Sequence, residues 1–88
     1  MNVAQAEANK KMTIVFIPAL VAVLVAKEKE AGREITREEV ESIRDSAAAI
    51  RVPIETARDM VKERGYLDID PENVWEEWLL HKKMTADN

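Results

Sequence analysis

The most apolar stretch of the chain is Ile14–Ala26, which contains no polar side chain and is followed directly by lysine and glutamate residues. Proline fits the first turn of a helix, because its missing N–H would have no partner there. We therefore predict a helix over 18–31, closed by Gly32, with the β-branched residues before Pro18 as an extended lead-in. The alternative is that the lead-in is helical and kinked at Pro18.

A helix that is apolar on every side must be surrounded by protein or by lipid. A membrane-spanning helix needs about 20 apolar residues, whereas this run is shorter and holds a proline near its start. A secretory signal would be followed by small residues at a cleavage site, whereas Lys27 and Glu28 follow here. We expect neither, and interpret the segment as the central helix of a soluble bundle.

The clearest helix start lies at Thr36, where the spacing fits a capping box. Thr36 can accept a hydrogen bond from the N–H of Glu39, and Glu39 can accept one from the N–H of Thr36. Ile35 and Val40 are spaced to pack across this box as a hydrophobic staple. The pattern predicts a helix over 37–51.

A third helix is predicted over 53–64. Pro53 disfavours the helical conformation of the residue before it and suits the first position of the next helix. Gly65 can adopt the left-handed conformation that ends a helix. Ile54, Ala57 and Val61 fall on one side of this segment, so we expect that side to face the core.

A fourth helix is predicted over 71–83, with Asp70 as the capping residue and Pro71 at the first position. Two tryptophans three residues apart, Trp75 and Trp78, are expected to cover the core, because each can bury a large aromatic surface. Leu80 and Met84 fall on the opposite side of the helical wheel, where a solvated helix is usually polar.

These elements predict an all-α fold, a small four-helix domain with a central hydrophobic helix. We expect a mobile N-terminal tail over 1–12, a single helical domain over 13–84 and a flexible C-terminus over 85–88. The predicted core comprises Phe16, Leu20, Val21, Leu24, Val40, Ile43, Ala47, Ile50, Ile54, Ala57, Val61, Val74, Trp75, Trp78 and Leu79.

Composition agrees with a folded, helix-rich chain, since 47% of the residues are hydrophobic and there are only two glycines and three prolines. The absence of cysteine excludes disulfides and thiolate metal sites, and suits a cytoplasmic location. The net charge is −4, and residues 67–88 carry the acidic excess.

The sequence offers little for catalysis or metal binding. Its single histidine, His81, lies four residues after Glu77, but two ligands do not make a metal site. Asp68, Asp70 and Glu72 alternate as calcium ligands do, yet the glycine of a calcium-binding loop is missing. We therefore expect no enzyme, no cofactor and no metal.

The segment 47–66 resembles the helix-turn-helix of small bacterial repressors, in which the second helix enters the major groove of DNA. The residues that match the pattern are Ala47, Ile50, Val52, Thr56, Arg58 and Met60. The resemblance implies a DNA-binding motif formed by residues 37–64. Its candidate nucleic-acid contacts are Arg51, Thr56, Arg58 and Lys62.

Charge is the main argument against this alternative. The outward side of the predicted helix over 53–64 centres on Glu55 and Asp59, and the positive surplus over 42–66 is a single charge. DNA-binding domains usually carry a clear basic surface. DNA binding is therefore the second hypothesis.

The leading hypothesis is a non-catalytic protein-interaction module that binds another protein or itself, in the second case as a homodimer. Its candidate contact residues are Leu80, Met84 and Trp75. We expect no membrane partner.

Overall fold

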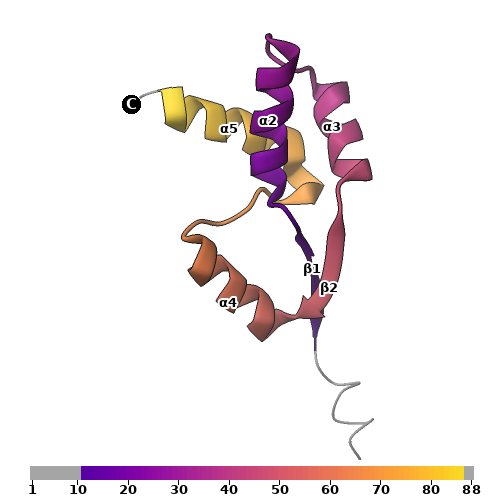
Figure 1. Ribbon diagram of the computed structural model, residues 1–88, viewed down its shortest axis with the longest axis vertical. Helices are drawn as coiled ribbons and strands as arrows, with labels where there is room; N and C mark the ends of the chain where they lie inside the picture. Colours follow the sequence, from indigo (N-terminus) through magenta and orange to yellow (C-terminus); the bar gives the residue numbers. More distant parts are fainter. Residues whose placement is uncertain (1–10, 87–88) are drawn as a thin grey trace, which may run out of the picture.

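The computed structural model describes residues 11–86, and its elements combine four α-helices with a two-stranded sheet (Figure 1). The predicted all-α class is therefore wrong, and the fold is a mixture of helices and strands. In chain order the elements are β1 (Met12–Phe16), α2 (Leu20–Ala31), α3 (Arg37–Ser46), β2 (Ala49–Pro53), α4 (Ile54–Arg64), the 3-10 helix η1 (Pro71–Asn73) and α5 (Val74–Ala86).

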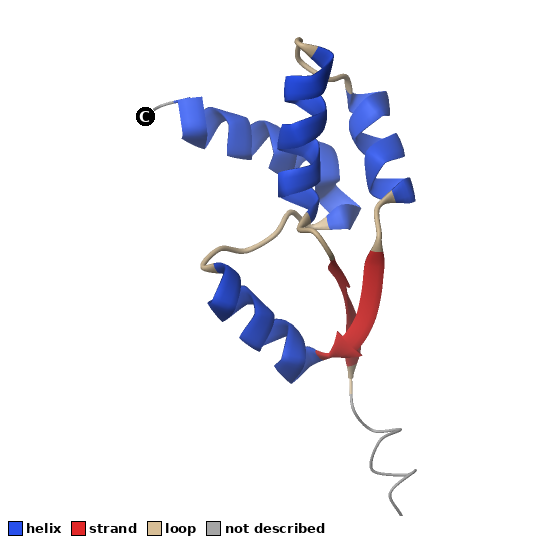
Figure 2. Ribbon diagram, in the orientation of Figure 1, coloured by secondary structure: helices blue, strands red, loops and turns tan. Residues whose placement is uncertain are grey.

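Strands β1 and β2 lie side by side (Figure 2) and form an antiparallel pair. In its register, Val15 is opposite Ile50. Two further hydrogen bonds extend the ladder, from the N–H of Ile17 to the carbonyl of Ala48 (3.1 Å) and from the N–H of Ile54 to that of Lys11 (3.2 Å). The extended lead-in before Pro18 is thus confirmed as a strand. Its partner strand was not expected.

The predicted helix over 37–51 is too long, because α3 ends at Ser46 and residues 49–53 belong to β2. Alanine favours helix, but pairing with β1 overrides this local preference. Pro53 lies at the edge of the sheet, where its missing N–H costs no ladder hydrogen bond. The helices predicted over 18–31, 53–64 and 71–83 correspond to α2, α4, and η1 with α5.

The core lies among α2, α3 and α5, whereas α4 lies beside the strands, apart from these three helices (Figure 1). Leu20 and Leu24 of the apolar helix α2 are fully buried in the same cluster as Trp78, but Ala22 and Ala26 of this helix are exposed, so the helix is not enclosed on every side as expected. However, α4 contributes no fully buried side chain. The buried cluster consists of Phe16, Ala19, Leu20, Val21, Leu24, Ile35, Val40, Ile69, Val74 and Trp78.

Some of the expected core residues lie elsewhere. Ile50 and Leu79 are exposed, Ile50 because it lies on the strand ribbon and Leu79 because it points away from the core. Ile43, Ala47 and Trp75 are partly buried against the cluster. The side chains of Ile54, Ala57 and Val61 are half-buried on α4.

Parts of both predicted tails belong to regular secondary structure. Met12, expected in the N-terminal tail, begins β1, and the expected C-terminal tail overlaps α5, which extends to Ala86. Residues 1–10 and 87–88 lie outside the described range.

Helix α2 is capped by a residue far away in the sequence. Ala19, which precedes the helix, has no side chain that can accept a hydrogen bond. The carboxylate of Asp68 instead accepts from the N–H of Leu20 (2.7 Å) and from that of Val21 (2.8 Å). It also accepts from the N–H of Ile69 (2.8 Å). The negative charge of this carboxylate, near the positive end of the helix dipole, stabilises α2 further.

Replacing Asp68 with alanine should destabilise the fold by about 2 kcal/mol, because two helix N–H groups lose a charged acceptor. Urea unfolding followed by circular dichroism measures this change. The matched control is Asp59→Ala, since Asp59 is exposed on α4 and should be replaceable with little effect. Equal stability of the two variants would contradict the role given to Asp68.

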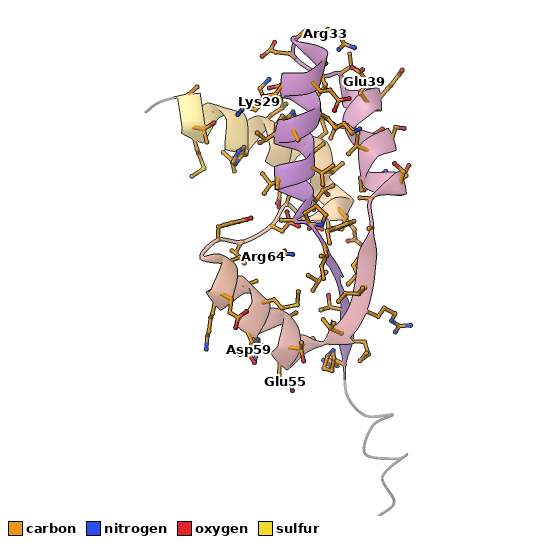
Figure 3. All side chains as sticks on the ribbon, viewed as in Figure 1. Lys29, Arg33, Glu39, Glu55, Asp59 and Arg64 are labelled. Carbon is orange, nitrogen blue, oxygen red and sulfur yellow. The ribbon has the colours of Figure 1, made fainter. Side chains whose placement is uncertain are left out.

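The predicted capping box is confirmed at the start of α3. Glu39 accepts from the N–H of Thr36 (2.9 Å), and the N–H of Glu39 donates to the Thr36 hydroxyl (3.2 Å). The guanidinium group of Arg33 binds the same carboxylate through two hydrogen bonds of 2.8 Å (Figure 3). These hydrogen bonds, first from Arg33 and then from the backbone of Thr36, lower the pKa of Glu39 to about 2.

This pKa predicts a loss of stability in acid. The pKa of Glu39 in the folded state lies below the ordinary value of 4.5. The contribution of the ionised side chain to the free energy of unfolding is therefore complete above pH 4.5. It is lost as the pH falls toward 2. The free energy of unfolding, measured with urea at a series of pH values, should therefore decrease less toward acid pH for Glu39→Gln than for the unmodified chain. Parallel curves across this window would contradict the assignment.

Candidate protein-interaction groove

A groove of about 810 Å³ lies between α2, the segment 65–70 and α5. Its lining combines apolar side chains from three separate parts of the chain with a few polar ones. The lining residues are Val21, Ala22, Val25, Tyr66, Leu67, Asp68, Ile69, Asp70, Glu77, Leu80, His81 and Met84.

Helical spacing explains how two of these parts present apolar side chains to the groove. On α2, Val21 and Val25 are one turn apart and therefore lie on the same side. On α5, Leu80 and Met84 have the same spacing. The side chains on α5 remain strongly exposed, with relative accessibilities of 56% for Leu80 and 64% for Met84.

The third wall is the segment that joins α4 to α5. Gly65 ends α4 with a φ of 82°, a left-handed conformation that favours glycine. Asp68 holds the segment against the start of α2, and the side chain of Ile69 is buried in the core. Leu67, directly before Asp68, projects outward with a relative accessibility of 80%.

The polar side chains of the groove are mainly acidic. Glu77 accepts a hydrogen bond from the N–H of Asp70 (2.8 Å). The side chain of Asp70 accepts from the N–H of Glu72 (3.0 Å) and from Asn73 (3.1 Å). No lysine or arginine is among the described residues that line the groove. A positively charged segment would therefore be attracted to this surface.

The side of α5 that faces away from the groove is fastened to α2. Lys82 forms ion pairs with Glu28 (3.0 Å) and Glu34 (2.9 Å), and its Nζ lies 5.7 Å from the centroid of the Trp78 ring. Burial lowers the pKa of Lys82, but the hydrogen bonds to the two glutamates outweigh it and raise the pKa above its ordinary value. His81, which itself lines the groove, stacks on Trp78, with ring centroids 5.8 Å apart. These contacts fix the position of α5 relative to α2, and with it the width of the groove.

Of the candidate contact residues, Leu80 and Met84 lie together in the groove. Trp75 does not, because its position on α5 turns it toward the core, where it is partly buried. Tyr66 and Leu67 were missed. An apolar pair directly after the helix-ending Gly65, with no helical periodicity of its own, was the signal that could have indicated them.

The helix-turn-helix of the second hypothesis, over 37–64, is not formed, because strand β2 separates α3 from α4. The candidate nucleic-acid residues are divided between two elements. Arg51 lies on β2, whereas Thr56, Arg58 and Lys62 lie on α4. The labelled Glu55 and Asp59 are exposed on the same helix (Figure 3). The motif is thus wrong, while DNA binding itself stays an untested prediction.

Residues 11–86 hold no group of three or more histidine, cysteine, aspartate or glutamate side chains placed to bind a metal ion. None of the helices in this range has both the length and the apolar character needed to cross a membrane.

Comparisons with protein-family models, with curated proteins and with solved structures find no match to this chain.

The exposure of Leu80 and Met84 predicts that these two side chains contribute little to stability. Leu80→Asp combined with Met84→Asp should change the free energy of unfolding by less than about 1 kcal/mol, as is usual for surface positions. Leu24→Ala, at a fully buried position, should cost about 2–5 kcal/mol. Thermal unfolding of the two variants measures the contrast. A large loss for the double variant would show that these side chains belong to the core.

Proposed function

We propose that the protein is a non-catalytic protein-interaction domain, and that the groove between α2, the segment 65–70 and α5 is its binding surface. The observation that supports this most directly is the exposure of Leu67, Leu80 and Met84 around one cavity. Contiguous apolar surface of this kind typically marks an interaction site. In the groove-binding mode, an amphipathic helix places its apolar side chains into such a surface.

The polar groups of the groove support binding more than catalysis. Asp68 and Asp70 accept hydrogen bonds from nearby backbone N–H groups, Glu77 accepts from the N–H of Asp70, and His81 stacks on Trp78. General acid–base catalysis needs a group that is placed to exchange a proton with a substrate. These side chains instead hold the walls of the groove in position. A cytoplasmic location, expected from the absence of cysteine, is part of the same proposal.

Site-specific photo-crosslinking in an extract of the native cells tests this proposal. Leu67 is replaced by photoreactive p-benzoylphenylalanine, which its exposed position should tolerate. We expect a discrete adduct that contains a protein, either a second copy or a different chain. The same substitution at the exposed Glu38 on α3 is the control, and should give no such adduct.

A second control introduces Leu80→Asp and Met84→Asp into the Leu67 photoreactive chain. Loss of the adduct would tie it to the groove. If Leu67 gives no protein adduct, or gives one that this double substitution leaves unchanged, the groove is not the binding surface.

A further inference from the structure

The outer edge of strand β2 carries backbone groups that no other strand of the described part of the chain pairs with, because the sheet there has only two strands. The hydrogen bonds at both ends of the ladder fix its alternation, in which Ile50 and Val52 exchange hydrogen bonds with β1. The backbone groups of Ala49, Arg51 and Pro53 therefore point away from β1. Ala49 and Arg51 each present an N–H and a C=O group, whereas Pro53 has no N–H.

The opposite edge of the sheet, on β1, is in contact with helix α4. The carbonyl of Phe16 points outward from β1, and the guanidinium group of Arg64 donates a hydrogen bond to it (2.6 Å). On β2, in contrast, Ala49, Ile50 and Arg51 are exposed. A two-stranded sheet is only marginally stable in water by itself, and further strands stabilise it. The edge that can accept another strand is therefore that of β2.

We propose that the outer edge of β2 pairs antiparallel with the same edge of a second copy of this chain, so that the two sheets join into one of four strands. This interface lies outside the groove, and the inference does not rest on the proposed function. Antiparallel pairing of a strand with itself is symmetric, since a two-fold axis places the same residues of both subunits in the contact. Each outward N–H group then meets an outward carbonyl.

The residues of β2 favour one register for this pairing. With Ile50 on the two-fold axis, Ala49 of each copy is opposite Arg51 of the second copy, and the outward N–H groups of both residues find a carbonyl. Pro53, which has no N–H to pair, lies beyond this part of the strand. An axis at Arg51 would place two like charges directly opposite each other, which is destabilising. We therefore assign the axis to Ile50.

The side chains near this axis fit the arrangement. Ile50 lies on the same face of the sheet as Val15 and Val52, and its relative accessibility is 45%. On the axis of an antiparallel pair that is not hydrogen-bonded, the two Cα atoms lie about 4.5 Å apart and the side chains are close together. Each Ile50 would thus cover the other. Arg51 lies on the opposite face of the sheet, so its charge stays in water.

A cysteine at position 50 tests the register, since the chain has no cysteine of its own. Two Cα atoms about 4.5 Å apart lie within the range that a disulfide bridges. With oxidised glutathione as the oxidant, we expect a disulfide-linked dimer as the main product of Ile50→Cys. The matched control is Ile14→Cys, because Ile14 is similarly exposed (49%) on the opposite face. Equal yields of linked dimer from the two variants would overturn the inference.

Two substitutions of Arg51 separate the role of its N–H from that of its side chain. Arg51→Pro removes the outward N–H, whereas the pairing of β2 with β1 does not use it. Arg51→Ala, the matched control, keeps the N–H. In sedimentation equilibrium over about a hundredfold range of concentration, the unmodified chain and Arg51→Ala should be dimeric at the upper end. Arg51→Pro should weaken the dimer by about tenfold or more, because two hydrogen bonds are lost.

A monomer of the unmodified chain at every concentration would overturn the inference. An undiminished dimer of Arg51→Pro, with unchanged circular dichroism, would overturn it as well.

Opposite charges at position 50 test the same contact without a change of the backbone. Ile50→Lys and Ile50→Glu should each be monomeric, because like charges then face each other across the axis. An equimolar mixture of the two variants should form a mixed dimer, because lysine then faces glutamate. The exposure of Ile50 lets both variants fold. A mixture that stays monomeric would overturn the inference.

The edge of β2 and the groove share no residue, so their tests are independent. Leu80→Asp with Met84→Asp should leave the dimer unaffected, and loss of the dimer in this variant would overturn the edge as the interface. A monomeric chain whose photoreactive Leu67 forms a protein adduct overturns this inference alone. A dimer that depends on the Arg51 N–H, without any adduct at Leu67, overturns the proposed function alone.

Discussion

The carboxylate of Asp68 connects two parts of the chain that are 48 residues apart, and both the fold and the groove depend on it. Helix α2 begins without a local capping side chain, so its first N–H groups need an acceptor from elsewhere. Asp68 supplies this acceptor and at the same time holds the segment 65–70 against α2. The buried side chain of Ile69 follows immediately, whereas Leu67 just before it is left outside. The contact that stabilises the central helix thus also builds one wall of the groove.

Helix α5 combines two roles on its different sides. Trp78 and Lys82 fasten it to the core and to α2, and leave little freedom in its position. Leu80 and Met84 remain free to contact another molecule. Because the fastening contacts lie away from the groove, a change of the exposed side chains can alter binding without unfolding the domain. Substitutions of Leu80 and Met84 can therefore test the binding surface while the packing contacts of α5 stay intact.

Local sequence signals predicted the start of α3 and the ends of α2 and α4, and long-range pairing accounts for the main error, the end of α3. Thr36 with Glu39, Gly32 and Gly65 were found because their partners lie within a few residues. Strand β2 was missed because its partner β1 is distant, and because alanines at 47–49 favour a helix in isolation. The alternative helix-turn-helix interpretation was wrong for the same reason. For the groove, Leu80 and Met84 were identified from their position on the helical wheel, whereas Leu67 has no periodicity that would indicate it.

Amide hydrogen exchange measured by NMR tests the central role of Asp68 most directly. In the unmodified chain the amides of Leu20 and Val21, although in the first turn of a helix, should exchange slowly, because both donate to the Asp68 carboxylate. In Asp68→Ala these two amides should become fast, and the resonances of groove residues such as Val25 and Leu67 should shift. Unchanged protection of Leu20 and Val21 in this variant would contradict the account.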